Sequence, residues 1–170
     1  MQIEYRTGDI IDAAEPILVH GCNAQGIMGS GLARAIRDRL PFAYHAYRTA
    51  YETHGLQLGQ VIWAINMMPG ERPRVVGNAI TQEFYGNEPT QYVDDNAIRQ
   101  AIHEVDRFIQ IAYWNLDATG ITTALDKVAL PLIGAGLGGG KWPTISQIIE
   151  QESQHFIPVV YTLDGAIPHS

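Results

Sequence analysis

Three side chains that can take part in chemistry lie within one short segment: His20, Cys22 and Asn23. An imidazole has an unperturbed pKa of about 6.5, so a histidine can transfer protons at neutral pH. Residues two apart share one face of a strand, so the Cys22 thiol can pair with the His20 ring. The plainer alternatives are a half-buried histidine bonded to the backbone and a cysteine that fills the core. The sequence leaves both open.

The spacing of the histidines does not predict a metal site. The chain has six histidines and one cysteine, and no two histidines have the HxH or HExxH spacing that holds zinc. A single cysteine also excludes CxxC clusters and an internal disulfide framework. We therefore expect neither a built-in metal ion nor a cofactor.

Two dense clusters of glycine are the second unusual feature. Glycine loses more conformational entropy on folding than any other residue, and an ordinary turn needs only one or two. The clusters therefore predict loops whose backbone approaches a ligand closely, with N–H groups that bind an anion. Residues 21–31 and 134–140 together hold nine of the 17 glycines: Gly21, Gly26, Gly29, Gly31, Gly134, Gly136, Gly138, Gly139 and Gly140.

The second cluster satisfies a dinucleotide-binding pattern only in part. Gly134-Ala-Gly136-Leu-Gly138-Gly139 matches GxGxxG after a predicted strand. Only about thirty residues follow it, too few for the second half of a Rossmann dehydrogenase. The P-loop pattern also fails, because Trp142 stands after Gly140-Lys141 where Ser or Thr is needed. The segment is best interpreted as a general phosphate-binding loop.

The elements that must position these loops alternate along the chain. Apolar runs predict strands over 2–7, 16–22, 60–67, 74–81, 127–133 and 156–163. Apolar residues spaced by three and four predict helices over 30–40, 42–54, 94–116 and 143–153, with Asp94 or Asp95 as the N-cap of the third. This alternation predicts a three-layer α/β/α fold with a mixed, mostly parallel sheet of about six strands. Each glycine cluster follows a strand and precedes a helix, where open α/β sheets bind ligands.

Composition limits the classes to which the chain can belong. A length of 170 residues predicts a single domain over 1–170, and 46% hydrophobic with 17% charged residues argues against disorder. A net charge of −7 without a basic face speaks against direct nucleic-acid binding. No apolar run is long enough to span a membrane, and the N-terminus lacks a signal-peptide core. We therefore expect a cytoplasmic protein with no membrane partner.

Three separated segments resemble the macrodomains, a family that binds ADP-ribose. They are Gly8-Asp9-Ile10 after the first strand, HGCNAQGIMGSGLA at 20–33, and LPLIGAGLGGGKW at 130–142. Together with the last strand around Tyr161, they cover essentially the whole chain in the family's order. The first glycine segment looks most like the branch that contains the yeast-type ADP-ribose-1″-phosphate phosphatases.

The resemblance implies a role for each position near the ligand. Asp9 would accept a hydrogen bond from the adenine amino group beside the Ile10 N–H, and Tyr161 would flank the adenine. Asn23 would bond the hydroxyls of the distal ribose, and His20 would transfer a proton beside it, which makes these two the catalytic candidates. The loops would wrap the distal ribose with Gly29, Ser30 and Gly31, and the diphosphate with Gly134, Ala135, Gly136, Leu137 and Gly138.

Plainer interpretations stand beside three of these roles. Asp9 also suits a turn after Gly8, Asn23 suits an Asx turn at the end of a strand, and Tyr161 suits a buried strand position. For Asn23, the turn and ligand binding are compatible.

Two other branches of the family fit less well. The MacroD-type hydrolases carry two asparagines on the first loop and an aspartate after the glycines, where this chain has Leu32 and Ala33. The branch that removes ADP-ribose from glutamate or DNA uses a lysine after the fourth strand and, in some members, an aspartate in the second glycine loop. Gln82 and Gly138 stand at the matching positions, and neither is a nucleophile or a general base.

The resemblance therefore implies a domain that binds ADP-ribose or ADP-ribose-1″-phosphate and removes the phosphate from the latter. The unperturbed imidazole pKa predicts a rate that changes with an apparent pKa of about 6 to 7. The alternatives are a non-catalytic reader of ADP-ribose and a hydrolase of ADP-ribosyl groups or O-acetyl-ADP-ribose.

Overall fold

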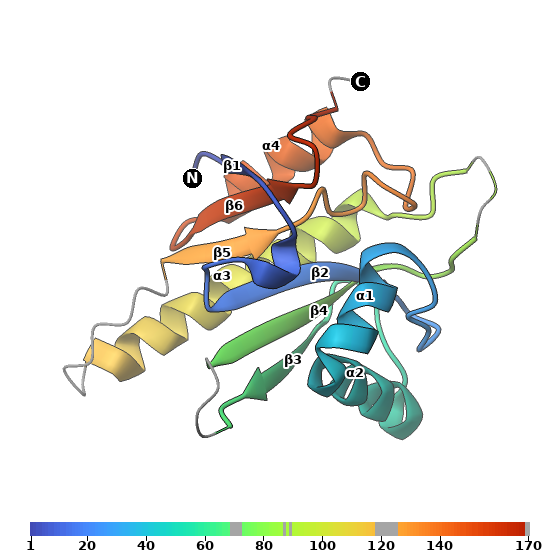
Figure 1. Cartoon of the computed structure of the whole chain (residues 1–170), viewed down its shortest axis with the longest axis horizontal. Coiled ribbons are helices and arrows are strands. Elements are labelled where there is room, and N and C mark those ends of the chain that lie inside the picture. Colours follow the sequence, from blue (N-terminus) through green and yellow to red (C-terminus); the bar gives the residue numbers. More distant parts are fainter. Residues whose placement is uncertain (69–72, 87, 89, 118–125, 169–170) are drawn as a thin grey trace.

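The computed structural model describes residues 1–68, 73–86, 88, 90–117 and 126–168. One six-stranded sheet runs through it in the order β1-β6-β5-β2-β4-β3 (Figure 1). Neighbouring strands are parallel except β3 and β4, so the predicted mixed, mostly parallel sheet is confirmed. The strands are β1 (Glu4–Thr7), β2 (Ile17–Asn23), β3 (Val61–Asn66), β4 (Arg74–Gln82), β5 (Lys127–Leu130) and β6 (Ile157–Thr162).

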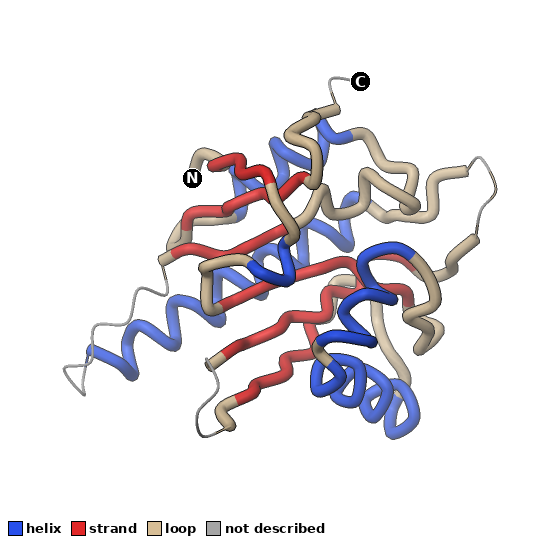
Figure 2. The backbone as a smooth tube through the Cα atoms, viewed as in Figure 1, coloured by secondary structure: helices blue, strands red, loops and turns tan. Residues whose placement is uncertain are grey.

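Helices cover both faces of this sheet, which gives the three predicted layers (Figure 2). One face packs against the two helices from the second half of the chain, and the other against the elements from the first half. None of the helices within the described ranges is both long and apolar enough to span a membrane. The helices are the 3-10 helix η1 (Ile10–Asp12), α1 (Gly31–Arg39), α2 (Pro41–His54), α3 (Asp95–Asp117) and α4 (Trp142–Glu152).

Strand β2 lies inside the sheet and sends alternate side chains to the two faces. Ile17 and Val19 join the core beneath α3 and α4. Leu18 joins the core beneath α1 and α2, and Cys22 joins the small cluster beside α2. The alternation therefore places His20 and Cys22 on the face that α1 and α2 cover.

Most predicted element boundaries lie within two residues of those observed. One strand ends earlier than predicted, and one short helix is additional. The predicted strand 127–133 ends at Leu130, because Pro131 has no N–H with which to continue a ladder. The helix η1 was not predicted, since three residues are too few to show a period; its Ile11 N–H bonds the Asp9 carboxylate at 2.9 Å. Asp94, one of two predicted N-caps, accepts the Ala97 N–H at 2.7 Å.

Candidate functional site

A cavity of about 970 Å³ lies where the five parallel strands end. Parallel strands bring their carboxyl ends to one edge of the sheet, so segments far apart in the sequence meet there. Each of these strands contributes lining residues at or just after its end: Asp9 after β1, Asn23 from β2, Gln82 from β4, Gly134 after β5 and Tyr161 from β6.

Every predicted site residue except Ala135 lines this cavity. Ala135 packs instead against the core beneath α3 and α4, so its side chain does not belong to the lining. The structure thus brings both glycine loops and the predicted side chains to one place, while their functions stay predictions. The lining includes Asp9, Ile10, His20, Asn23, Gly29, Ser30, Gly31, Gly134, Gly136, Leu137, Gly138 and Tyr161.

Asn23 holds the first glycine loop in shape. Its Oδ1 accepts the Gln25 N–H at 3.0 Å, and its Nδ2 donates to the Ile27 carbonyl at 2.7 Å. Its backbone carbonyl accepts the Tyr47 hydroxyl at 2.7 Å. The Asx-turn interpretation is therefore confirmed. An amide nitrogen carries two hydrogens, so this role in the loop is compatible with a bond to a ligand. Sequence reasoning missed Tyr47, a buried residue of α2, because only the fold brings it to the loop.

The N-terminus of α1 opens at the cavity. Ser30 precedes the helix in an extended conformation, and its side chain makes no capping hydrogen bond. The N–H groups of a first helical turn have no partner within the helix. Gly31, Leu32 and Ala33, the first residues of α1, line the cavity. The arrangement suits an anion, because the N–H groups and the helix dipole both favour negative charge.

The glycines of the second loop divide into two kinds. A Cβ on Gly138 would lie 2.7 Å from the Gly134 carbonyl oxygen, and one on Gly140 would lie 2.6 Å from a Val93 methyl carbon. Gly134 has a φ of 75°, a region that other residues rarely adopt. These three glycines are needed by the turn and its packing. A Cβ on Gly136 would meet nothing within 4 Å, so this position faces open space in the cavity that it lines.

His20 is buried, with 1% of its surface exposed. Its Nε2 lies 2.8 Å from Oδ1 of Asn78, whose Nδ2 donates to the carbonyls of Ala43 and Ile62 at 3.1 Å each. The amide nitrogen of Asn78 is thus the donor, and its Oδ1 accepts a hydrogen bond from Nε2 of His20. Sequence reasoning missed Asn78; the available signal was a single amide inside the apolar run RVVGNAIT.

Burial lowers the pKa of His20 to about 4, because the charged imidazolium loses its hydration, although the bond to Asn78 opposes this shift. The ring is therefore neutral at pH 7. The direction of this shift disagrees with the predicted titration at a pKa of 6 to 7, which assumed an imidazole in contact with water.

The predicted contact between Cys22 and His20 is confirmed. The sulfur lies 3.6 Å from Nε2 and 3.8 Å from Nδ1. Nearly equal distances place the sulfur beside the ring, because a bond along one lone pair would leave the other nitrogen much farther away. Burial raises the pKa of the Cys22 thiol, so it stays protonated. The pair therefore resembles core packing more than an activated nucleophile.

Asp9 and Tyr161 are each held by charged neighbours. Oδ2 of Asp9 pairs with Nη1 of Arg39 at 2.6 Å, and Arg39 also pairs with Asp12 at 2.8 Å. The Tyr161 hydroxyl donates to Oε2 of Glu15 at 2.8 Å. Tyr161 is half-buried and lines the cavity, so its ring is accessible there. Sequence motifs gave no indication of Arg39 or Glu15, since the residues that they bond lie far from them in the sequence.

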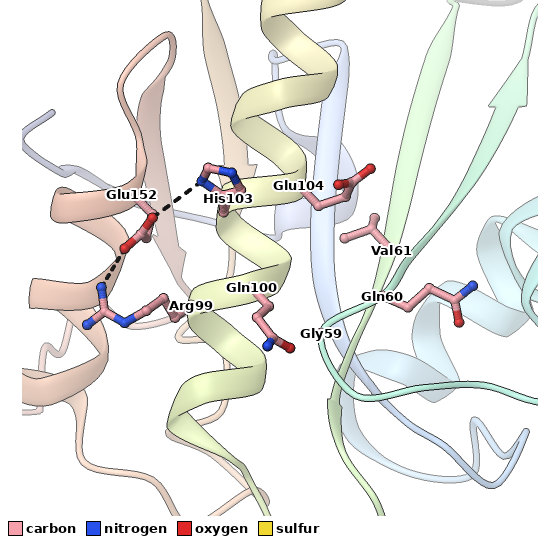
Figure 3. Close-up of a pocket in the computed structure, with 8 residues that line it drawn as sticks. All are labelled: Gly59, Gln60, Val61, Arg99, Gln100, His103, Glu104 and Glu152. Carbon is pink, nitrogen blue, oxygen red and sulfur yellow. Dashed lines mark hydrogen bonds and ion pairs between the residues drawn. The ribbon is translucent and has the colours of Figure 1, made fainter.

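A second hollow of about 640 Å³ lies beside α3, between the end of α4 and the start of β3 (Figure 3). Three of its side chains are engaged with one another: Glu152 bonds Arg99 and lies 3.6 Å from Nδ1 of His103. It gathers none of the predicted site residues. Among the residues that the structure describes, no group of three or more His, Cys, Asp or Glu is arranged to hold a metal ion. The first cavity is therefore the candidate site.

Comparison with known proteins gives one family match and several distant relatives. A model of the Macro domain matches residues 19–149. The DNA ADP-ribosyl glycohydrolase of Thermus aquaticus is 24% identical over 149 residues, 88% of this chain and 37% of that protein. The ADP-ribose 1″-phosphate phosphatase of Candida albicans is 26% identical over 162 residues, 91% of this chain and 96% of that protein. This chain thus spans little more than a third of the glycohydrolase and nearly all of the phosphatase.

Solved structures share the fold. The macrodomain of Thermus aquaticus DarG has a TM-score of 0.75 at 24% identity, with 95% of this chain and 98% of that chain covered. A protein of unknown function from Bacteroides thetaiotaomicron has a TM-score of 0.72 at 27% identity, with 95% and 98% covered. Both comparisons cover nearly the whole of this chain.

Proposed function

This chain belongs to the macrodomain family, and on that premise we propose that its cavity binds ADP-ribose and removes the terminal phosphate from ADP-ribose-1″-phosphate. Asp9, the Ile10 N–H and Tyr161 would hold the adenine. The second glycine loop would wrap the diphosphate, and the first would cover the distal ribose. A cavity of about 970 Å³ has room for such a ligand. Backbone N–H groups explain how a protein with a net charge of −7 can bind an anion.

The observation that carries the phosphatase proposal is the uncapped N-terminus of α1 beside the distal-ribose loop. A phosphate on the distal ribose would be bound by the N–H groups that follow Ser30, and these groups would stabilise charge that develops during phosphate transfer. The Candida albicans phosphatase, which this chain matches along nearly its full length, supports the same choice.

In the proposed reaction, His20 and Asn23 each have one role. Water attacks phosphorus, and the bond between phosphorus and the C1″ oxygen breaks to release inorganic phosphate and ADP-ribose. His20 accepts the proton of the attacking water at Nδ1, the ring nitrogen that does not bond Asn78. The proton then passes to the leaving oxygen. Asn23 holds the ribose hydroxyls so that the phosphate stays aligned.

Removal of ADP-ribose from DNA is the second candidate, because relatives that match most of this chain are DNA ADP-ribosyl glycohydrolases. Gln82 stands where the resemblance expects a lysine, and its Nε2 donates to the Phe84 carbonyl at 2.7 Å. A neutral amide cannot supply the charge or the basicity of a lysine. The phosphatase is therefore the preferred proposal, and a reader that binds ADP-ribose without turnover is the remaining alternative.

Titration calorimetry with ADP-ribose, ADP and AMP tests the ligand. We expect micromolar affinity for ADP-ribose, about −8 kcal/mol, and binding of ADP and AMP weaker by about tenfold or more. The difference arises because a ligand without the distal ribose leaves the first glycine loop and Asn23 without their partners. Equal affinities for AMP and ADP-ribose would contradict the assignment of that loop to the distal ribose.

A further inference from the structure

Glu15 is a nearly buried carboxylate beside the cavity that neither the sequence motifs nor the proposed reaction uses. Its side chain is 3% exposed, and its Oε1 pairs with Nη1 of Arg6 at 2.8 Å. Its Oε2 accepts the Tyr161 hydroxyl at 2.8 Å. The Arg6 side chain is 38% exposed, so water screens the ion pair, and the pair is weak evidence of a role in stability. A role in fixing the position of a neighbour explains it better.

The three residues come from three segments that meet at the cavity. Arg6 lies on β1 and is the register partner of Tyr161 on β6, and these strands lie side by side (Figure 1). Glu15 lies in the connection from η1 to β2. The helix η1 begins directly after Asp9, which lines the cavity together with Tyr161. Glu15 therefore ties the segment that carries Asp9 to the strand that carries Tyr161.

Asp9 is fixed independently on its own side. Its Oδ1 accepts the Ile11 N–H at 2.9 Å, and its Oδ2 pairs with Arg39 at 2.6 Å. With Asp9 fixed in this way, the separation between Asp9 and the Tyr161 ring depends on what holds that ring. In this structure its hydroxyl donates to Glu15 and is also bonded by the Arg6 guanidinium, which itself pairs with Glu15.

We propose that Glu15 is a positioning residue that fixes Tyr161 as one wall of the adenine end of the cavity and thereby sets a preference for a purine base. The inference rests on the proposed ADP-ribose function. A phenol bonded to a carboxylate cannot swing away without giving up a charge-assisted hydrogen bond. A purine covers more of a fixed aromatic wall than a pyrimidine does, so the purine gains more from it.

The test compares ADP-ribose with uridine diphosphate ribose in calorimetric titrations of Tyr161→Phe and Glu15→Gln. Tyr161→Phe removes the hydrogen bond between residues 161 and 15, and Glu15→Gln removes the negative charge of its acceptor. Each variant should weaken ADP-ribose binding about tenfold. Binding of the pyrimidine ligand should change less than about twofold, because a pyrimidine base has less contact with the Tyr161 ring. The double variant should also lose about tenfold rather than a hundredfold, since both changes act on the same hydrogen bond between residues 161 and 15. Tyr44→Phe, on α2 and outside the residues that line the cavity, is the matched control and should bind both ligands as the wild type does.

Tyr161→Phe leaves the pair of Glu15 with Arg6 in place, so it decides the question even if Glu15→Gln does not fold. Unchanged ADP-ribose affinity in Tyr161→Phe would overturn the proposal. Equal weakening of both ligands would also overturn it, because that result indicates a general structural role. Failure of the proposed function looks different: the wild-type protein would not bind ADP-ribose at all.

Discussion

Gly136→Glu is expected to weaken ADP-ribose binding at least about 100-fold without unfolding the protein. A Cβ at this position meets nothing within 4 Å, and the position lines the cavity, so the fold should accept a side chain there. The new carboxylate would stand against the diphosphate. Two unit charges about 4 Å apart near a protein surface repel by about 4 kcal/mol, and a 100-fold loss needs only about 2.8 kcal/mol. Calorimetry measures the affinity, and thermal unfolding checks the fold.

Three control variants separate charge, space and fold in this experiment. Gly136→Ala adds only a methyl group to open space and should bind within about threefold of wild type. Thr49→Glu adds the same charge to an exposed position of α2 and should bind normally. Gly138→Ala should destabilise the protein, because its Cβ would lie 2.7 Å from the Gly134 carbonyl oxygen. A folded Gly136→Glu protein with wild-type affinity would show that the second loop is only a structural turn.

His20→Gln is expected to lower the rate of phosphate release by about 10²–10⁴-fold, the usual range for a lost acid–base group. Glutamine can still donate to Asn78, so the buried hydrogen bond and the fold should survive, whereas an amide cannot accept a proton at neutral pH. Affinity for ADP-ribose should stay within about threefold of wild type, since the role of His20 is confined to the reaction. His103→Gln, the same change in the second hollow, is the matched control and should leave the rate unchanged.

The pH profile of the wild type adds an independent check on His20. The histidine acts in its neutral form, and burial lowers its pKa to about 4. Protonation of His20 should therefore cause no change in the rate between about pH 6 and 8 and should lower the rate only as the pH drops below about 5, where the ring gains a proton. An inflection between pH 6 and 7 that disappears in His20→Gln would contradict a buried, neutral ring. A full rate in His20→Gln would move proton transfer to another group.

The sequence predicted the layers and the place of the site because those depend on local patterns. The alternation of strands and helices predicted the mixed sheet. The two glycine clusters, which each follow a strand, predicted the place of the cavity. The pairing of buried polar groups could not be predicted in this way. Asn78 bonds His20 at a separation of 58 residues, and Glu15 bonds Tyr161 at a separation of 146. Such pairs depend on strand order, which hydrophobic periodicity does not specify.

The surroundings of individual site residues depend on the fold in the same way. Ala135 belongs to a glycine motif, but the path of the loop turns it toward the core. The pKa of His20 depends on how deeply its ring is buried, and this burial is a property of the packed fold. Within the second glycine cluster, the motif treats all members alike, whereas only the backbone geometry separates Gly136 from Gly134, Gly138 and Gly140.

Release of inorganic phosphate from ADP-ribose-1″-phosphate by the wild-type protein tests the central claim most directly. We predict release of one phosphate per substrate molecule, with ADP-ribose as the other product, at a rate that is proportional to protein concentration. Added ADP-ribose should inhibit the reaction, and Gly136→Glu should lose it, because both act at the same cavity. No phosphate release at high protein concentration, with ADP-ribose binding intact, would contradict the phosphatase and leave a protein that binds ADP-ribose without turning it over.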